Sequence, residues 1–214
     1  RWWREQLEAF SSDYPENAVA WYWQGVGSLE VGGVQRSLGL FEKAAELAAR
    51  GMPPAFLAVN GNKRSITLDL RRPEAVEVVT RLAATADVVW ENFRGGVMDR
   101  LGLGYEALSA INPKLIYCGV SGFGRTGPEQ STAAFDGKLQ AMSGIMSITG
   151  EPASGPTRAG FALCDTIGGI TAALAVASAL YQRTHTGRGQ LVDVAMLDAA
   201  LAFIAGPVSE YTVA

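Results

Sequence analysis

The chain has 214 residues, of which 48% are hydrophobic, 18% charged and 9% aromatic. This balance is typical of a globular protein and excludes a disordered chain, a collagen-like repeat and a disulfide scaffold. Eighteen basic and 21 acidic residues give a formal net charge of -3, and neither sign forms a long run. The sequence therefore offers no basic stripe for nucleic acid or an anionic membrane, and we expect a small molecule or another protein as the partner.

The cysteine content and the apolar stretches predict a cytoplasmic protein. Cys118 and Cys164 lie far apart in a chain longer than a disulfide-stapled module, so we expect free thiols in a reducing compartment. The longest apolar stretch, residues 167–181, is shorter than the roughly 20 residues of a membrane span and predicts a buried helix. Because the first residue is Arg1 rather than Met, we expect a piece of a longer polypeptide.

Hydrophobic periodicity predicts alternating helices and strands along most of the chain. The predicted helices cover residues 38–50, 73–86, 97–111, 135–150, 166–184 and 197–206, and the predicted strands cover residues 65–70, 87–93, 115–120 and 190–196. This alternation is typical of an α/β fold with a parallel sheet. In such sheets ligands bind beyond the carboxyl ends of the strands. Those ends are residues 68–71, 91–94 and 121–125.

Two aspartates stand at predicted helix starts. Asp165 lies where the loop GFALC meets the long apolar helix, and Asp136 opens the stretch FDGKLQ. Each has a plain interpretation as a helix N-cap, which for Asp136 would be solvated. At a helix N-terminus a carboxylate stays ionised well below neutral pH, and Asp165 could then attack an activated acyl group. The capping and nucleophilic roles do not exclude each other.

Other catalytic patterns find little support. The single histidine, His185, lies near a predicted turn, so we expect an exposed residue. One His and two distant Cys exclude a Cys/His zinc site, and a Ser/His/Asp triad would have to use this one imidazole. The P-loop pattern is absent. Four arginines near the predicted strand ends could instead hold phosphates, although most arginines only solvate a surface. They are Arg71, Arg94, Arg100 and Arg125.

Several long strings resemble the class III CoA-transferases, the family of formyl-CoA transferase and carnitine CoA-transferase. They occur in the family's order over about residues 55–204: NKRSITLDL, ADVVWENFRGGVMDRLGLGYEAL, NPKLIYCGVSGFGRTGP, FDGKLQAMSGIMSITG and GFALCDTIGGITAALAVASALYQRTHTGRGQLVDVAMLDAAL. The resemblance implies a Rossmann-like parallel sheet with flanking helices. It also implies that residues 55–214 form the core of the family's large domain, truncated before the small domain. Residues 1–54 are then a divergent N-terminal helical segment whose role the sequence does not indicate.

The resemblance implies transfer of CoA from an acyl-CoA to a carboxylic acid. In the family the aspartate of Gly-x-x-x-x-Asp attacks the thioester and passes through a mixed anhydride to an aspartyl-CoA thioester. Here the motif begins at Gly160, and the nucleophile would be Asp165. CoA is a substrate rather than a permanent cofactor, and no metal is expected. Family members form interlocked homodimers.

The CoA contacts of the family match residues at the predicted strand ends, one residue in the predicted helix over residues 97–111, and the stretch at the start of the predicted helix over residues 135–150. At position 133, where formyl-CoA transferase has lysine, this chain has alanine, so one charged contact is absent. The matching residues are Leu68, Asp69, Leu70, Arg71, Asn92, Phe93, Arg94, Arg100, Ala133, Ala134, Phe135 and Asp136.

Two alternatives remain open. The α-methylacyl-CoA racemases share the fold, but they carry a histidine immediately before the aspartate that matches Asp136, where this chain has Phe135. Without that imidazole one acid/base partner for proton transfer is missing, so transfer is favoured over racemisation. The other alternative is a CoA-binding remnant without turnover.

Overall fold

The computed structural model describes residue 56 and residues 59–213. The chain divides into two compact units, residues 1–67 and residues 68–214, and the fold below is that of the second. The predicted helix over residues 38–50 lies outside the described residues, as does the N-terminal segment 1–54.

Three parallel strands form the sheet of the second unit. They are β1 (Val88–Glu91), β2 (Ile116–Ser121) and β3 (Leu191–Ala195), in the spatial order β1-β2-β3. Val88 pairs with Ile116, and Tyr117 pairs with Leu191. The predicted α/β fold with a parallel sheet is confirmed, and each of these strands lies within one residue of its predicted range or inside it.

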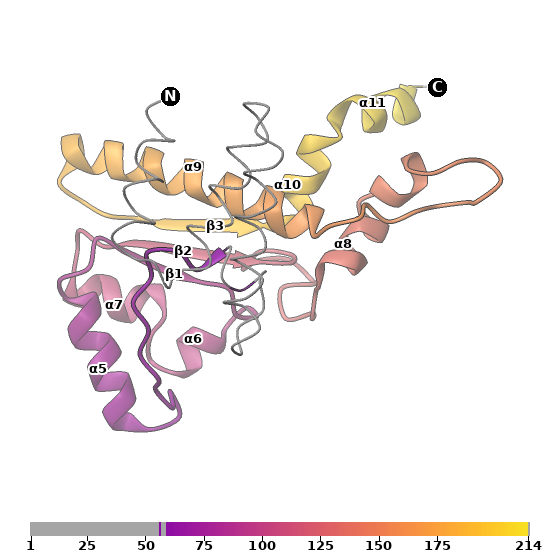
Figure 1. Ribbon diagram of the computed structural model, residues 1–214. Coiled ribbons are helices and arrows are strands. Elements are labelled where there is room, and N and C mark those ends of the chain that lie inside the picture. Colours follow the sequence, from indigo (N-terminus) through magenta and orange to yellow (C-terminus); the bar gives the residue numbers. More distant parts are fainter. Residues whose placement is uncertain (1–55, 57–58, 214) are drawn as a thin grey trace, which may run out of the picture. The chain divides into compact units, whose positions relative to one another are not determined.

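Helices cover both faces of this sheet (Figure 1). On one face lie α5 (Pro73–Ala83), α6 (Val97–Arg100) and α7 (Tyr105–Ile111). On the other face lie α9 (Leu163–Thr186) and α10 (Met196–Phe203). Helix α8 (Asp136–Met142) and the 3₁₀ helix η1 (Ile145–Ile148) follow the end of β2, and α11 (Ala205–Val213) follows α10.

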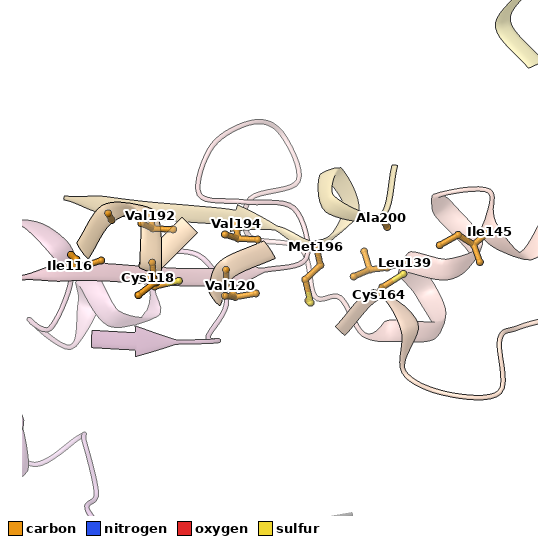
Figure 2. Packing of buried hydrophobic residues seen from close by; sticks show 13 residues of the cluster. Ile116, Cys118, Val120, Leu139, Ile145, Cys164, Val192, Val194, Met196 and Ala200 are labelled. Carbon is orange, nitrogen blue, oxygen red and sulfur yellow. The ribbon is translucent and has the colours of Figure 1, made fainter. Parts of the chain in front are cut away.

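Strand β2 is buried on both faces because its side chains alternate between two apolar clusters. Ile116, Cys118 and Val120 pack with β3, α9 and the end of α8, and Figure 2 shows Leu139 and Cys164 at the far end of this cluster. Leu115, just before the strand, and Tyr117 instead pack with residues of the α5–α7 face. The central strand thus holds both helix layers in place.

Three predicted elements differ from the structure. Residues 65–70 are not a strand, because no strand among the described residues pairs with them and the side chains of residues 65–67 are exposed. The predicted helix over residues 97–111 is two helices, interrupted where Gly102 takes φ 73°. The predicted helix over residues 135–150 is α8 followed by the short helix η1. The two are separated where Gly144 takes φ 85°, a left-handed conformation that ends an α-helix.

Helix α9 is longer than the sequence indicates. It has 24 residues, and among the described residues it is the one helix long and apolar enough to cross a membrane by those two criteria. A core helix passes the same test. In this fold one face of α9 is buried: Ala172, Val176 and Ala179 lie in the cluster that contains β2 and β3. Its other face, with Ile170 and Leu174, is exposed.

Candidate active site

A small pocket of about 70 Å³ lies at the carboxyl ends of β1 and β2. It is lined by Asn92, Phe93 and Arg94 after β1, by Ser121, Gly122 and Phe123 at the end of β2, and by Ala134 and Met196 among others. Four of the predicted CoA-contacting residues therefore meet here, although Ala134 lies about 40 residues along the chain from the other three. Parallel α/β sheets bind ligands at this edge.

The loop after β1 is held by two hydrogen bonds. The Asn92 amide donates to the carbonyl of Val120 on β2, and the Phe93 N–H donates to Glu91 Oε2 at 2.7 Å. Phe93 and Arg94 remain exposed at the rim. Arg100, at the end of α6, lies near the same loop. Its Nη1 would be 3.2 Å from a Cβ placed on Gly96.

The predicted contacts at residues 68–71 are not part of this pocket. Arg71 binds Asp69 through two hydrogen bonds of 2.9 and 3.0 Å, in an exposed turn. These bonds lower the pKa of Asp69 and raise that of Arg71. A phosphate would have to compete with Asp69 for this guanidinium.

Arg125 is likewise engaged with the protein. Its Nη2 lies 3.0 Å from Asp99 Oδ2, its Nη1 lies 3.9 Å from Glu91 Oε1, and its N–H donates to Asp193. The guanidinium also lies 5.8 Å from the centroid of the Tyr117 ring. Burial raises the pKa of Glu91, and Arg125 acts in the opposite direction. Arg125 thus links several elements, and a phosphate would have to compete with Asp99 and Glu91 for its guanidinium.

Asp165 is the third residue of α9 and not its N-cap, which is Ala162. Its side chain is exposed, as a nucleophile requires. Partial burial and the neighbouring carboxylate of Asp136 raise the pKa of Asp165. The sequence predicts the opposite direction from the helix N-terminus alone. Partial burial and the negative charge of Asp136, which both favour the protonated form of Asp165, outweigh the effect of the helix N-terminus.

Asp136 is buried and not a solvated cap. It is the first residue of α8, yet its Oδ1 accepts a 2.8 Å hydrogen bond from the N–H of Cys164, the second residue of α9. Its Oδ2 accepts a 2.6 Å bond from the Gln140 amide. Asp136 therefore satisfies one of the free N–H groups at the start of the neighbouring helix. Phe135 beside it is exposed.

Lys138 is a charged residue near the site that the sequence analysis missed. Its Nζ donates to the Ala133 carbonyl at 3.0 Å and lies 5.0 Å from the centroid of the Phe123 ring. An ammonium group therefore stands beside position 133, although the residue at that position is alanine. The sequence signal was a lysine two positions after Asp136, which helical spacing alone does not direct toward the preceding loop.

The remaining candidate groups do not build a second reactive site. Cys118 and Cys164 are buried free thiols, and burial raises both pKa values to about 11. His185 is exposed but helical, in the last turn of α9, with its ring 4.9 Å from that of Tyr181. Across residues 59–213 no three His, Cys, Asp or Glu side chains gather in a way that could hold a metal ion.

A larger hollow of about 520 Å³ lies at the opposite, amino ends of the strands. Its lining includes Asp87, Lys114 and Arg183, and the Arg183 guanidinium is bound to Asp87 at 2.7 Å. None of the predicted site residues contributes to it. We therefore place the candidate site at the carboxyl edge, where four of those residues meet.

Comparison with known proteins identifies the family. A family model described as CoA-transferase family III matches residues 31–214. The chain is 46% identical to a succinate–glutarate CoA-transferase of Agrobacterium fabrum over 74% of this chain and 40% of the relative. It is 49% identical to an acetyl-CoA:oxalate CoA-transferase of Acetobacter aceti over 70% of this chain and 39% of the relative.

A solved structure gives the same result. The crystal structure of a CaiB/BaiF family protein from Brucella suis matches with a TM-score of 0.69 and 47% identity, over 71% of this chain and 40% of that chain. The chain thus spans about 40% of the length of the proteins it matches. On the sequence and the fold together, it belongs to CoA-transferase family III.

Proposed function

We propose that this chain carries the catalytic core of a CoA-transferase, which moves CoA from an acyl-CoA donor to a small carboxylic acid with Asp165 as the nucleophile. The observation that carries the proposal is an exposed carboxylate in the first turn of α9, beside an N–H group that Asp136 has already bound. The raised pKa makes this carboxylate more basic and hence a better nucleophile.

The proposed reaction needs neither water nor an oxidant. An Asp165 oxygen attacks the thioester carbonyl, the C–S bond breaks, and a mixed anhydride and the CoA thiolate form. The thiolate then attacks the Asp165 carbonyl of the anhydride, which releases the donor acid and leaves an aspartyl-CoA thioester. The acceptor carboxylate displaces the thiolate from this thioester, giving a second anhydride. Attack of the thiolate on the acceptor's carbonyl yields the new acyl-CoA and frees Asp165.

The pocket and its rim suit the CoA part of the substrate. Arg94 lies in the loop after β1 and Arg100 is the last residue of α6, and both offer planar charge for phosphates. The exposed ring of Phe93 offers an apolar surface. We assign to CoA binding these residues together with Asn92, Ala133, Ala134, Phe135 and Asp136, and we extend the proposal to Leu68, Asp69, Leu70 and Arg71 at the neighbouring turn.

The relatives support the substrate class. They are named for succinate and glutarate, and for acetyl-CoA and oxalate. We therefore propose an acyl-CoA and a small carboxylic acid as the substrates, with CoA as a substrate and no permanently bound cofactor. We further propose that the protein is cytoplasmic and forms a homodimer. We also propose that residues 55–214 form the core of the large domain and that residues 1–54 form a separate N-terminal segment.

Racemisation fits the site less well. Phe135 precedes Asp136, and the one histidine of the chain, His185, is 20 residues beyond Asp165 on the same helix. At 1.5 Å per residue that is about 30 Å along α9, too far for the two groups to share a substrate carbon. A racemase would exchange deuterium at the α carbon without any acid acceptor, and we expect no such exchange.

Trapping of the acylated aspartate tests the proposal. The full-length protein is incubated with succinyl-CoA and hydroxylamine, and mass spectrometry locates the adduct. We expect a hydroxamate on Asp165 that requires succinyl-CoA and is absent from Asp165→Ala. Asp198→Ala is a matched control, because Asp198 is exposed and is also the third residue of its helix, α10.

Two results would overturn the proposal. One is an adduct on another residue, and the other is an Asp165→Ala variant that transfers CoA as fast as the parent. Binding of CoA without any adduct would identify a CoA-binding protein without turnover.

A further inference from the structure

Gln140 is the most deeply buried polar side chain near the candidate site. Its side chain is 0% exposed, whereas Asp136 and Ser143, the other buried polar residues described, are 9% and 4% exposed. A glutamine in an apolar interior is costly unless its amide groups find partners. This one is well supplied with them.

The amide binds three groups from two parts of the chain. Nε2 donates to Asp136 Oδ2 at 2.6 Å and to the Phe161 carbonyl at 3.1 Å. Oε1 accepts from the Ala159 N–H at 2.9 Å. Both N–H donors and the carbonyl oxygen are thus used inside the protein.

Asp136 and Gln140 act together on the segment that leads into α9. They are four residues apart on α8, so they share one face of that helix. Gln140 binds the backbone at Ala159 and Phe161, and Asp136 binds the N–H of Cys164. The backbone is therefore held at three points within six residues, and Asp165 follows directly.

That segment has no regular structure of its own. Residues 157–162 belong to no helix or strand, and the α9 N-cap Ala162 makes no side-chain capping bond. Side chains of α8 supply the hydrogen bonds that a helix or sheet would otherwise provide. The direction in which α9 starts thus depends on the Asp136–Gln140 pair.

We propose that Gln140 is a positioning residue of the transfer reaction, which fixes the backbone of residues 159–164 and the carboxylate of Asp136 so that Asp165 meets the thioester in one orientation. This inference rests on the proposed function. Gln140 itself touches no substrate. Methionine would fill a similar volume without a polar group to desolvate, so filling the core does not by itself require an amide at this position.

The test separates turnover from binding. Gln140→Met keeps the volume of the side chain and removes all three hydrogen bonds. Since a displacement of about 1 Å at a nucleophile can cost two orders of magnitude in rate, we expect kcat to fall at least tenfold. We expect KM for succinyl-CoA to change less than about twofold, because the pocket is built largely from the ends of β1 and β2. The rate of hydroxamate formation on Asp165 should fall with kcat.

Ser143→Ala is the matched control. Ser143 is buried directly after α8, and its hydroxyl donates to the Gln140 backbone carbonyl. It also meets the Cys164 thiol, but it makes none of the three bonds that hold the backbone of residues 159–164. This variant removes a buried hydrogen bond from the same helix, so it should lower the melting temperature yet keep kcat within about twofold of the parent. Should Gln140→Met not fold, Gln140→Asn carries the test, because it retains an amide that is one methylene too short; we expect the same loss of kcat at constant KM.

The outcomes distinguish this inference from the proposed function. If Asp165 is trapped normally and the Gln140 variants keep the kcat of the parent, the positioning role is wrong and the proposed function stands. An equal loss of kcat in Ser143→Ala, or a rise in KM that accounts for the whole effect, also overturns it. If Asp165 is never acylated in the parent, the proposed function fails first.

Discussion

At the scale of single residues, the cations near the site differ in whether a carboxylate of the protein already binds them. Arg125 and Arg71 are bound to carboxylates, whereas Lys138 contacts a backbone carbonyl and an aromatic ring. Within residues 59–213 no carboxylate pairs with Lys138, so its ammonium group is open to an anionic substrate. Lys138 is therefore a better candidate than Arg125 for a charged contact with an anionic substrate, although the sequence analysis named Arg125 and not Lys138.

Replacing Lys138 by methionine should weaken acyl-CoA binding. The aliphatic stem is retained and the charge is lost, so we expect KM for succinyl-CoA to rise about tenfold or more, because a hydrogen bond to a charged group contributes about 1.5–3 kcal/mol. We expect kcat to stay within about twofold. Lys114→Met, at the amino end of β2, is the control and should leave both constants unchanged. Steady-state kinetics at fixed ionic strength measure the effect, and an unchanged KM contradicts it.

Asp165 should carry a cost in stability at neutral pH. Its pKa is raised in the folded protein, so the folded state favours the protonated form. The stabilising contribution of this group is complete below the unfolded pKa, about 3.9, and is lost as the pH rises through the folded value. Asp165→Asn should therefore be more stable than the parent at pH 7, and the difference should shrink on acidification toward pH 4.5.

Urea unfolding of both proteins across that range measures this difference. A gain that grows toward low pH would contradict the direction of the shift. Loss of transfer activity in the same variant is expected on independent grounds, because the amide is a poor nucleophile.

At the scale of elements, close approaches of backbone fix where β3 enters the sheet. The chain turns from α9 at Gly187 and passes Gly189, whose N–H donates to the Pro113 carbonyl at 2.9 Å. A Cβ on Gly189 would collide with the Leu115 carbonyl. This contact aligns the start of β3 with the start of β2, and hence aligns the carboxyl ends that form the site.

Gly189→Ala should destabilise the protein by about 2 kcal/mol, since backbone and not a flexible side chain must move. The control is Gly169→Ala inside α9, where no atom lies within 4 Å of the added Cβ. Alanine should stabilise that helix position by about 0.5–1 kcal/mol. Chemical denaturation measures the change in the free energy of unfolding for each variant. If the two changes are equal, a Cβ at position 189 does not collide with the backbone.

At the scale of the whole second unit, Arg125 connects parts of the sheet with the helix layer beneath it. Its ion pairs reach Glu91 on β1 and Asp99 on α6, and its backbone N–H binds Asp193 on β3. The Arg125 side chain is 20% exposed and that of Glu91 is 9% exposed. Removing Arg125 would leave a nearly buried carboxylate without its cation.

Arg125→Met should therefore lower the free energy of unfolding by about 2 kcal/mol, below the 3–5 kcal/mol typical of a fully buried pair because Asp99 is exposed to water. Arg71→Met removes the fully exposed pair with Asp69 and should not change stability measurably. Thermal and urea unfolding compare the two. If both variants lose the same free energy of unfolding, the ion pairs of Arg125 contribute no more to stability than an exposed pair does.

Sequence reasoning predicted the parts of this protein that depend on local pattern. The strands predicted at residues 87–93, 115–120 and 190–196 are confirmed by β1, β2 and β3, and Pro73 does begin α5. The strand expected at residues 65–70 failed because a strand exists only with a partner, which local alternation does not report. Glycines 102 and 144 divided helices because positive φ angles end a helical run.

The sequence by itself determined the alternation of elements and the place of Asp165 at the start of a long apolar helix, since periodicity and helix-start signals act over a few residues. Only the tertiary structure decided which groups meet there. The bond from Cys164 to Asp136 joins residues 28 positions apart, and the bond from Arg125 to Asp193 joins residues 68 apart. Such partners, and with them the raised pKa of Asp165, follow from how helices dock on the sheet, which no local pattern specifies.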